Sequence, residues 1–453
     1  NFFEFENKID YTNFLNRACF WMATGSGKTI VIVKLIEMLY SFMKNNIIPN
    51  KHILVIAPND KLIYQIKKHI TIFNKCNSKS HKISLKDLKD FEKNTFAGLN
   101  PIMPNEISIY YTRSSLISDD NKENMFDYKS YILKNGWYLI LDEAHKGEQE
   151  NSKRKTYINI LGKNGFIFNF SATFTDLLDE VTTIYNFNLA EFIKKGYGKN
   201  IKILDDEFKN FKAKNKKEEE NNLEKDEKIK IIIKSFIVFT VLKKIYEKIE
   251  NINIDKNLNL DYHNPLMVTL SNEINTKEAD MKLYFNYISK LAKINIDIKL
   301  FESIKEEIVS NLKENLLYVI GEDLLSELFI DEVKLITQKD VLKYVFYADS
   351  PSEIEVNEIS GNKEELTFKL KTSEKIFALI NASDITKWKK DTLENYIFND
   401  DIVSESRFLD VHKKKNEINI LMGSRKFIEG WDSNRPNIIN FINMGVGDEN
   451  TKL

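Results

Sequence analysis

The sequence predicts an α/β protein with two blocks of parallel strands and helices, the second of which contains an insertion. Three observations predict this class. Apolar strand-like runs alternate with helical patterns from Asn1 to about Lys199. A second block of the same kind starts at Asn264 ("NPLMVTLSN") and resumes at Glu417 ("EINILMG") and Asn437 ("NIINFINMG"). The length of 453 residues also exceeds that of one ordinary domain.

Three buried strands are predicted in the first block. "HILVIAP" (residues 52–58) is an unbroken apolar run, and "KLIYQIKKHITIF" after it has helical spacing. "WYLILDEAH" (137–145) and "GFIFNFSATF" (165–174) are further strands that run into polar turns. Strands that alternate with helices predict a parallel sheet covered on both faces.

Three regions follow from these patterns. We expect a first domain over residues 1–204, a charged linker and helix over 205–260, and a second domain over 261–453. The charged segment mixes both signs and lacks apolar periodicity, which is typical of a solvated linker or surface helix.

The insertion in the second domain is predicted over about residues 290–383. Its first part, to residue 347, has helical patterns. Its second part contains "SEIEVNEIS", "EELTFKLKT" and "KIFALINAS", which are typical of short antiparallel strands.

Composition excludes several classes of protein. The formal net charge is −1, so any contact with nucleic acid must come from a local basic groove rather than from a global field. The two cysteines, Cys19 and Cys76, are too few for a metal cluster or a disulfide framework, and we expect free thiols in a reducing cytosol.

No signal peptide or membrane span is evident in the sequence. The best candidate, "IKIIIKSFIVFTVLKKIYEKI" from Ile229, is interrupted by Lys230, Lys234, Lys243 and Lys244. We therefore predict a buried or amphipathic helix there, and a cytoplasmic protein without a membrane partner.

The segment "CFWMATGSGKTIVIVKLIEML" (residues 19–39) predicts a phosphate-binding loop between a strand and a helix. Gly25 and Gly27 allow positive φ and close approach of the backbone, and the helix that follows adds its N-terminal dipole. Lys28 suits the β- and γ-phosphates, and the Thr29 hydroxyl suits Mg²⁺. The expected ATP-binding residues of this loop are Thr24, Gly25, Ser26, Gly27, Lys28 and Thr29.

"LILDEAHKG" delivers two carboxylates to the carboxyl end of a predicted strand, where α/β sheets place their ligands. Asp142 is suited to hold Mg²⁺ through its water shell, so Asp142 and Thr29 are the expected metal-binding residues. Glu143 can orient and deprotonate the attacking water. His145 completes the Asp-Glu-Ala-His sequence, so the candidate catalytic residues are Lys28, Asp142, Glu143 and His145.

"NFSATF" (residues 169–174) places small hydroxyl residues after the next strand. In this order, the P-loop, "APNDKLIYQI", "DEAH" and "SAT" resemble the first motor domain of superfamily 2 helicases and translocases. In the second block, "LMGSRKFIEGWDSNRP" (421–436) resembles the motif of the second motor domain that ends in Gly-x-Asp.

The longer form of this second motif is similar to the helicase subunit of type III restriction enzymes. Four further segments resemble the same subunit: "FWMATGSGKT", "YTRSSL", "YNFNLAEFIKKGYGKNI" and "SRFLDVHKKKNEINILMGSRKF".

The resemblance implies two RecA-like domains with ATP and Mg²⁺ bound between them, and movement along nucleic acid driven by hydrolysis. It implies coupling through Ser171, Ala172 and Thr173, and ATP contacts from Gly430 and Asp432. Contacts to the phosphates of the nucleic acid are expected from Pro58, Asn59, Arg113, Ser114 and Ser115.

The last motor motif of the family, with its arginine finger, is expected beyond Leu453. Arg425 and Arg435 match other parts of the pattern and are not assigned that role. The Glu-x-Lys triplet within "DEVK" (331–334) arises freely in a chain rich in Lys and Glu, so no nuclease is assigned. We expect the chain to be the motor part of a larger protein.

Three hypotheses follow. The leading one is an ATP-dependent DNA translocase acting on duplex DNA, the motor of a type III restriction subunit with a DNA methyltransferase partner. The second is a DExH helicase that acts on RNA or in DNA repair, which a requirement for the 2′-hydroxyl would favour. The third is a scaffold that binds nucleic acid without hydrolysing ATP.

Overall fold

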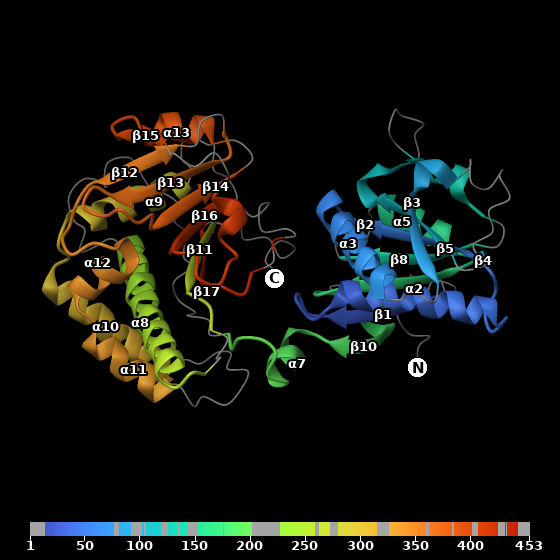
Figure 1. The fold of residues 1–453 in the computed structure, drawn as a ribbon, viewed down its shortest axis with the longest axis horizontal. Coiled ribbons are helices and arrows are strands. Elements are labelled where there is room, and N and C mark those ends of the chain that lie inside the picture. Colours follow the sequence, from blue (N-terminus) through green and yellow to red (C-terminus); the bar gives the residue numbers. More distant parts are fainter. Residues whose placement is uncertain are drawn as a thin grey trace. The chain divides into compact units, whose positions relative to one another are not determined.

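The chain forms two compact units, residues 1–200 and residues 201–452. A computed structural model describes residues 14–76, 81–91, 102–103, 106–118, 126–133, 136–143, 153–174, 176–201, 227–258, 262–271, 280–314, 326–358, 362–382, 385–400, 406–424, 431 and 433–442. Each unit is built around its own β-sheet (Figure 1).

The sheet of the first unit has the strand order β10-β1-β9-β8-β2-β5-β3, and β4 pairs with β5 at its side. All neighbours in this order are parallel, and the short β4 is antiparallel to β5. The strands are β1 (Arg17–Met22), β2 (His52–Ala57), β3 (Lys82–Asp87), β4 (Ile102–Met103), β5 (Glu106–Arg113), β8 (Trp137–Asp142), β9 (Phe166–Ser171) and β10 (Thr183–Phe187). The predicted parallel sheet is thereby confirmed.

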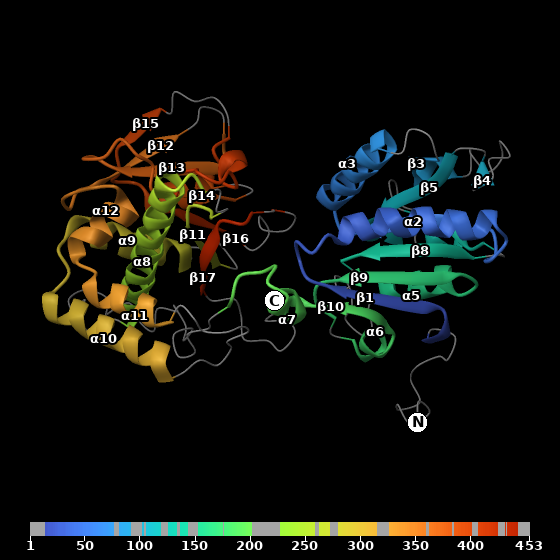
Figure 2. The ribbon, with the colours of Figure 1, turned by 60° about the horizontal axis from the view of Figure 1, so that its bottom comes forward.

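Helices cover both faces of this sheet, because its central strands are apolar on both sides. Ile53 and Val55 of β2 pack on one face with α2 and α3, which lie side by side (Figure 2). Leu54 and Ile56 pack on the opposite face, where α5 lies. The helices are α2 (Lys28–Lys44), α3 (Asp60–Cys76) and α5 (Lys153–Gly162).

Short elements complete the first unit. Asp176 and Asn188 accept backbone N–H bonds as side-chain caps of α6 and α7. The short elements are η2 (Leu88–Asp90), η3 (Ser114–Leu116), β6 (Ile117–Ser118), β7 (Phe126–Asp127), η4 (Tyr128–Tyr131), α6 (Leu177–Val181) and α7 (Leu189–Lys194).

The sheet of the second unit has the order β15-β12-β13-β14-β16-β11-β17 and is mixed. In the insertion, β12 and β14 each pair in antiparallel fashion with β13 between them, as predicted. They form no separate sheet, because β14 pairs in parallel with β16, with Ala378 opposite Ile420. The strands are β11 (Leu266–Ser271), β12 (Ile354–Glu358), β13 (Glu365–Leu370), β14 (Ala378–Asn381), β15 (Phe398–Asp400), β16 (Ile420–Ser424) and β17 (Pro436–Ile442).

Helices of the second unit gather on one face of its sheet around the long helix α8 (Figure 1). This helix corresponds to the apolar segment from Ile229, and its residues Phe236, Ile237 and Phe239 are buried in the core. Buried Lys234 pairs with Glu307 of α10 at 2.6 Å. The helices are α8 (Glu227–Asp255), α9 (Asp280–Lys293), α10 (Ile298–Glu314), α11 (Ser326–Leu335), α12 (Gln338–Phe346), α13 (Thr386–Thr392) and η6 (Phe408–Asp410).

The buried-helix prediction for this segment is therefore confirmed. Within the part of the chain that the structure describes, no helix combines the length and apolarity needed to cross a bilayer. The "DEVK" segment with its Glu-x-Lys triplet lies on α11. There Lys334 pairs with Asp331 at the surface, at 3.0 Å.

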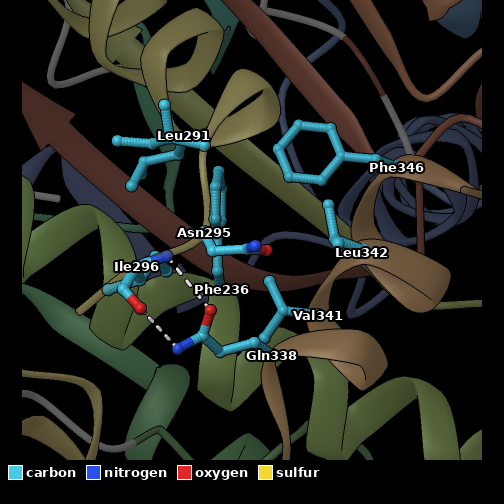
Figure 3. Close-up of a pocket in the computed structure, with 9 residues that line it drawn as sticks. Phe236, Leu291, Asn295, Ile296, Gln338, Val341, Leu342 and Phe346 are labelled. Atoms are coloured by element: carbon cyan, nitrogen blue, oxygen red, sulfur yellow. Dashed lines mark hydrogen bonds between the residues drawn. The ribbon is translucent and has the colours of Figure 1, made fainter. Parts of the chain in front are cut away.

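A small apolar pocket lies between α8, α9 and α12 (Figure 3). At its rim the Gln338 side chain donates to the Ile296 carbonyl at 2.6 Å and accepts from the Ile296 N–H at 3.0 Å. The amide thus ties the connection before α10 to α12. Apart from Asn295, the rest of the lining is apolar and includes Phe236, Leu291 and Phe346, which indicates a packing feature of the second unit.

Arg435 is fully buried just before β17 and bonds mainly to main-chain oxygens. Its guanidinium donates to the carbonyls of Asn264 (2.8 Å), Val411 (2.6 Å), Ile418 (2.7 Å) and Pro265 (3.4 Å) and to Asn416 Oδ1 (3.2 Å). These bonds join the segments that precede three neighbouring strands. Because its donors are used inside the unit, Arg435 acts as a structural anchor.

Lys243 of α8 is buried beside this anchor. Its ammonium donates to Asn264 Oδ1 at 2.7 Å and to Asn419 Oδ1 at 3.0 Å. Burial and the nearby charge of Arg435 lower the pKa of Lys243 to about 7. A buried lysine with this pKa makes the stability of the second unit depend on pH.

We expect the free energy of unfolding to rise with pH above about 7 because of Lys243. Between this pKa and the ordinary lysine value of 10.5, the unfolded chain binds one more proton than the folded chain. The slope from this group is up to about 1.4 kcal/mol per pH unit. Denaturant unfolding of the wild type and Lys243→Met across this window measures it.

Lys413→Met is the matched control, because Lys413 is an exposed lysine of the same unit. The difference between wild type and Lys243→Met should grow with pH, and that between wild type and the control should stay flat. A flat difference for Lys243→Met would show that this lysine remains protonated.

Candidate nucleotide site

The parallel register of the first sheet brings the predicted site residues to one edge. The carboxyl ends of parallel strands meet at the same edge. In this register Trp21 lies opposite Ser171, Leu141 opposite Ile56, and Ala57 opposite Arg113. The P-loop, the Asp-Glu pair, the Ser-Ala-Thr segment and both predicted nucleic-acid segments therefore follow neighbouring strand ends.

The P-loop has the backbone that its glycines predict. Gly25 and Gly27 have φ of 79° and 91°, in the left-handed region that favours glycine. A Cβ at either position would meet no atom within 4 Å, so the space beside both glycines is open. Lys28 begins α2, and no side chain caps this helix at its N-terminus. The first N–H groups of α2 are therefore available to an anion.

Ser26 supplies a second indication of a ligand in the loop. Its Oγ is buried and has no hydrogen-bond partner among the described residues. A buried hydroxyl without a partner costs free energy that a ligand oxygen can recover. The open space beside the glycines and this hydroxyl fit a phosphate group.

Lys28 and Glu143 form an ion pair across the P-loop and the end of β8. Their side chains are only 10% and 16% exposed. Glu143 has a φ of 52°, a conformation that costs a residue other than glycine about 1 kcal/mol. The strained backbone turns this carboxylate toward the lysine that is expected to bind phosphate.

Asp142 is the last residue of β8 and is 4% exposed. Burial and the neighbouring Glu143 carboxylate raise the pKa of Asp142 to about 6, although Lys28 acts in the opposite direction. A divalent cation beside this carboxylate would reverse the shift, because it favours the charged form.

Within the described residues, no three acidic, histidine or cysteine side chains gather as metal ligands. Mg²⁺ keeps several waters and takes one or two protein ligands together with phosphate oxygens. Thr29 in the first turn of α2 and Asp142 at the strand end are the residues that could serve.

The Ser-Ala-Thr segment forms a tight turn directly after β9. Ser171 Oγ donates to the Thr173 carbonyl at 2.7 Å and accepts from the Thr173 N–H at 3.1 Å. The indole of Trp21 donates to the Ala172 carbonyl at 2.9 Å. Trp21 lies in the segment that contains the P-loop, and the sequence pattern alone indicates no role for it. A partly buried indole needs a hydrogen-bond partner. This need is the feature that could have drawn attention to Trp21.

Three other predicted site residues lie outside the described residues: His145, Gly430 and Asp432. Their roles stay predictions from the sequence.

The predicted nucleic-acid residues divide between two adjacent strand ends. After β2, Pro58 and Asn59 lead into α3, and Asn59 Oδ1 accepts from the Leu62 N–H at 3.0 Å. This bond helps to fix the start of the helix. The Asn59 side chain therefore has a structural role whether or not it also touches a ligand.

At the end of β5, Arg113 pairs with Asp60 at 3.0 Å, and their side chains are 37% and 77% exposed. An exposed pair of this kind is weak, so the guanidinium can exchange Asp60 for another anion. Ser114 and Ser115 follow in η3. Close by, Lys67 of α3 donates to the Tyr111 hydroxyl at 2.9 Å.

Comparison with known proteins agrees with this geometry. Residues 4–176 match a family model described as the res subunit of type III restriction enzymes. The matched range contains the P-loop, the Asp-Glu pair and the Ser-Ala-Thr segment.

A protein of Methanocaldococcus jannaschii named for the endonuclease subunit of a type I restriction enzyme is 28% identical over 176 residues. The match covers 37% of this chain and 16% of that protein. The two comparisons name different types of restriction enzyme, and both support the resemblance to a restriction-enzyme subunit. Residues 4–176 are therefore similar to the res subunit of type III restriction enzymes.

Proposed function

We propose that this chain is the ATP-driven DNA motor of a restriction-enzyme subunit. The observation that carries the proposal is the Lys28–Glu143 pair beside buried Asp142, at the edge where the P-loop lies. This arrangement holds a phosphate-binding cation and a proton acceptor next to each other, as hydrolysis of a nucleoside triphosphate requires.

In this mechanism, the phosphates of ATP bind at the N-terminus of α2, against the N–H groups that follow Gly27 and near the Ser26 hydroxyl. Lys28 leaves Glu143 for the β- and γ-phosphates, which carry more negative charge than one carboxylate. Glu143 then orients a water and accepts its proton. Thr29 and Asp142 would hold Mg²⁺, which neutralises phosphate charge when bound with ATP.

DNA contacts are proposed at the adjoining strand ends. Arg113 is partly exposed and pairs with exposed Asp60, so a DNA phosphate can replace that partner. Pro58, Asn59, Ser114 and Ser115 flank it. We further propose that the substrate is duplex DNA, that a DNA methyltransferase is the partner, and that the protein acts in the cytoplasm.

ATP hydrolysis in the presence of duplex DNA, single-stranded DNA or RNA tests the function. We expect stimulation by duplex DNA. Stimulation by RNA alone would instead support a DExH helicase acting on RNA. Tight ATP binding without hydrolysis, both by this chain and by a version extended past Leu453, would support a scaffold that binds nucleic acid.

Lys28→Ala should weaken ATP binding and lower the hydrolysis rate by at least about a hundredfold, because it removes the cation that faces the phosphates. Steady-state hydrolysis and calorimetric ATP titration measure these effects. Lys34→Ala is the control, since Lys34 lies on the same helix with an exposed side chain and pairs with Glu37. Hydrolysis by Lys28→Ala at the wild-type rate would refute the P-loop assignment.

Glu143→Gln should bind ATP and DNA but hydrolyse ATP about 10²- to 10⁴-fold more slowly, because the amide has the same shape and cannot accept the proton. Single-turnover kinetics separates this chemical step from binding. Glu106→Gln, at a surface carboxylate paired with Lys86, is the matched control. Full turnover by Glu143→Gln would remove Glu143 as the general base.

A further inference from the structure

We infer that Trp21 is a positioning residue that couples the nucleotide-binding loop to the Ser-Ala-Thr segment. The inference rests on the proposed function, because it concerns how binding of ATP at the P-loop changes binding of DNA elsewhere. It assigns a role to a side chain of β1 that contacts neither ligand in the proposed mechanism.

Trp21 holds the Ser-Ala-Thr segment through two different contacts. Its indole Nε1 donates to the Ala172 carbonyl at 2.9 Å. Its ring packs edge-on against the buried ring of Phe174, with centroids 5.9 Å apart and planes at 79°. The backbone of Trp21 is also in register with Ser171 across the β1–β9 ladder. One residue thereby contacts Ser171 and Ala172 of the segment and Phe174 directly after it.

The same strand leads directly into the P-loop. Ala23, two residues after Trp21, donates its N–H to the Phe187 carbonyl at 2.9 Å, and its carbonyl accepts from the Ser26 N–H at 3.1 Å. The first bond ties the residue after β1 to the last residue of β10, and the second closes the first turn of the P-loop on that same residue. A movement of the loop on binding phosphate therefore also moves the end of β1, because no flexible linker separates the two.

A second anchor holds the other end of this region to β1. The carboxylate of Asp179, in α6, accepts from Arg17 at 2.6 Å and from Asn169 at 2.8 Å. Both members of the Arg17–Asp179 pair are buried, so breaking the pair would be costly. Because the Arg17–Asp179 pair anchors α6, we expect a shift of Trp21 to move the turn from Ser171 to Phe174 rather than α6.

Equilibrium coupling between the two ligands tests this role without hydrolysis. The Glu143→Gln chain is titrated with a fluorescein-labelled DNA duplex, with and without Mg·ATP, and anisotropy gives the factor by which ATP changes DNA affinity. Coupling of this kind is typically about 5- to 150-fold. Adding Trp21→Phe keeps an aromatic ring against Phe174 and removes the N–H donor.

We expect Trp21→Phe to bring this factor close to one, while the Kd for ATP alone and for DNA alone change by about twofold or less. A purely structural role would weaken the affinities for ATP and for DNA together. It would leave unchanged the factor by which ATP changes DNA affinity. Trp137→Phe is the matched control, because the Trp137 indole donates to the Tyr131 carbonyl at 2.7 Å in the same unit. It should leave the factor unchanged.

Phe174→Leu provides a second variant if Trp21→Phe does not fold, since it loosens the same turn and leaves the indole intact. It should lower the factor in the same direction. An unchanged factor in a folded Trp21 or Phe174 variant would overturn the inference and leave the proposed function standing. Absence of DNA binding, or of any ATP effect on it, in the Glu143→Gln chain would overturn both.

Discussion

The ion pair between Lys28 and Glu143 is the interaction on which the proposed chemistry depends. It exists because β1 and β8 run parallel in the same sheet, so the residues after their carboxyl ends reach one edge. The pair stabilises a carboxylate in a strained left-handed conformation beside buried Asp142. Two carboxylates and one ammonium lie close together here. Mg²⁺ would balance the carboxylates, and the phosphates of a nucleotide would balance the ammonium.

Cations with little exposure have two kinds of partner in the described residues. Lys28 and Arg17 of the first unit and Lys234 of the second pair with carboxylates. Arg435 and Lys243 of the second unit bond to main-chain carbonyls and asparagine oxygens. Hydrogen bonding without a counter-charge satisfies the donors, but burial still opposes protonation of lysine. In the proposed mechanism Lys28 exchanges its partner for a ligand, whereas the bonds of Arg435 join the segments before three strands.

Much of the first unit could be predicted, because its phosphate-binding loop and buried strands depend on short stretches of sequence. A phosphate loop requires glycine at positive φ, and a buried parallel strand requires an unbroken apolar run, so Gly25, Gly27 and the strand before Asp142 were identifiable. The pairing of β14 with β16 was not, because periodicity does not encode which distant segments pair. Nor does residue type reveal that Arg435 is buried or that Trp21 bonds to Ala172, since both depend on tertiary packing.

In the proposed mechanism the partner of Lys28 changes from Glu143 to the nucleotide. A crystal structure of this chain with Mg²⁺ and a non-hydrolysable ATP analogue would show this change. We expect Lys28 Nζ on the β- and γ-phosphates, Glu143 separated from it and facing a water, and Asp142 and Thr29 next to the cation. A structure in which the Lys28–Glu143 pair stays intact while the analogue binds elsewhere would contradict it.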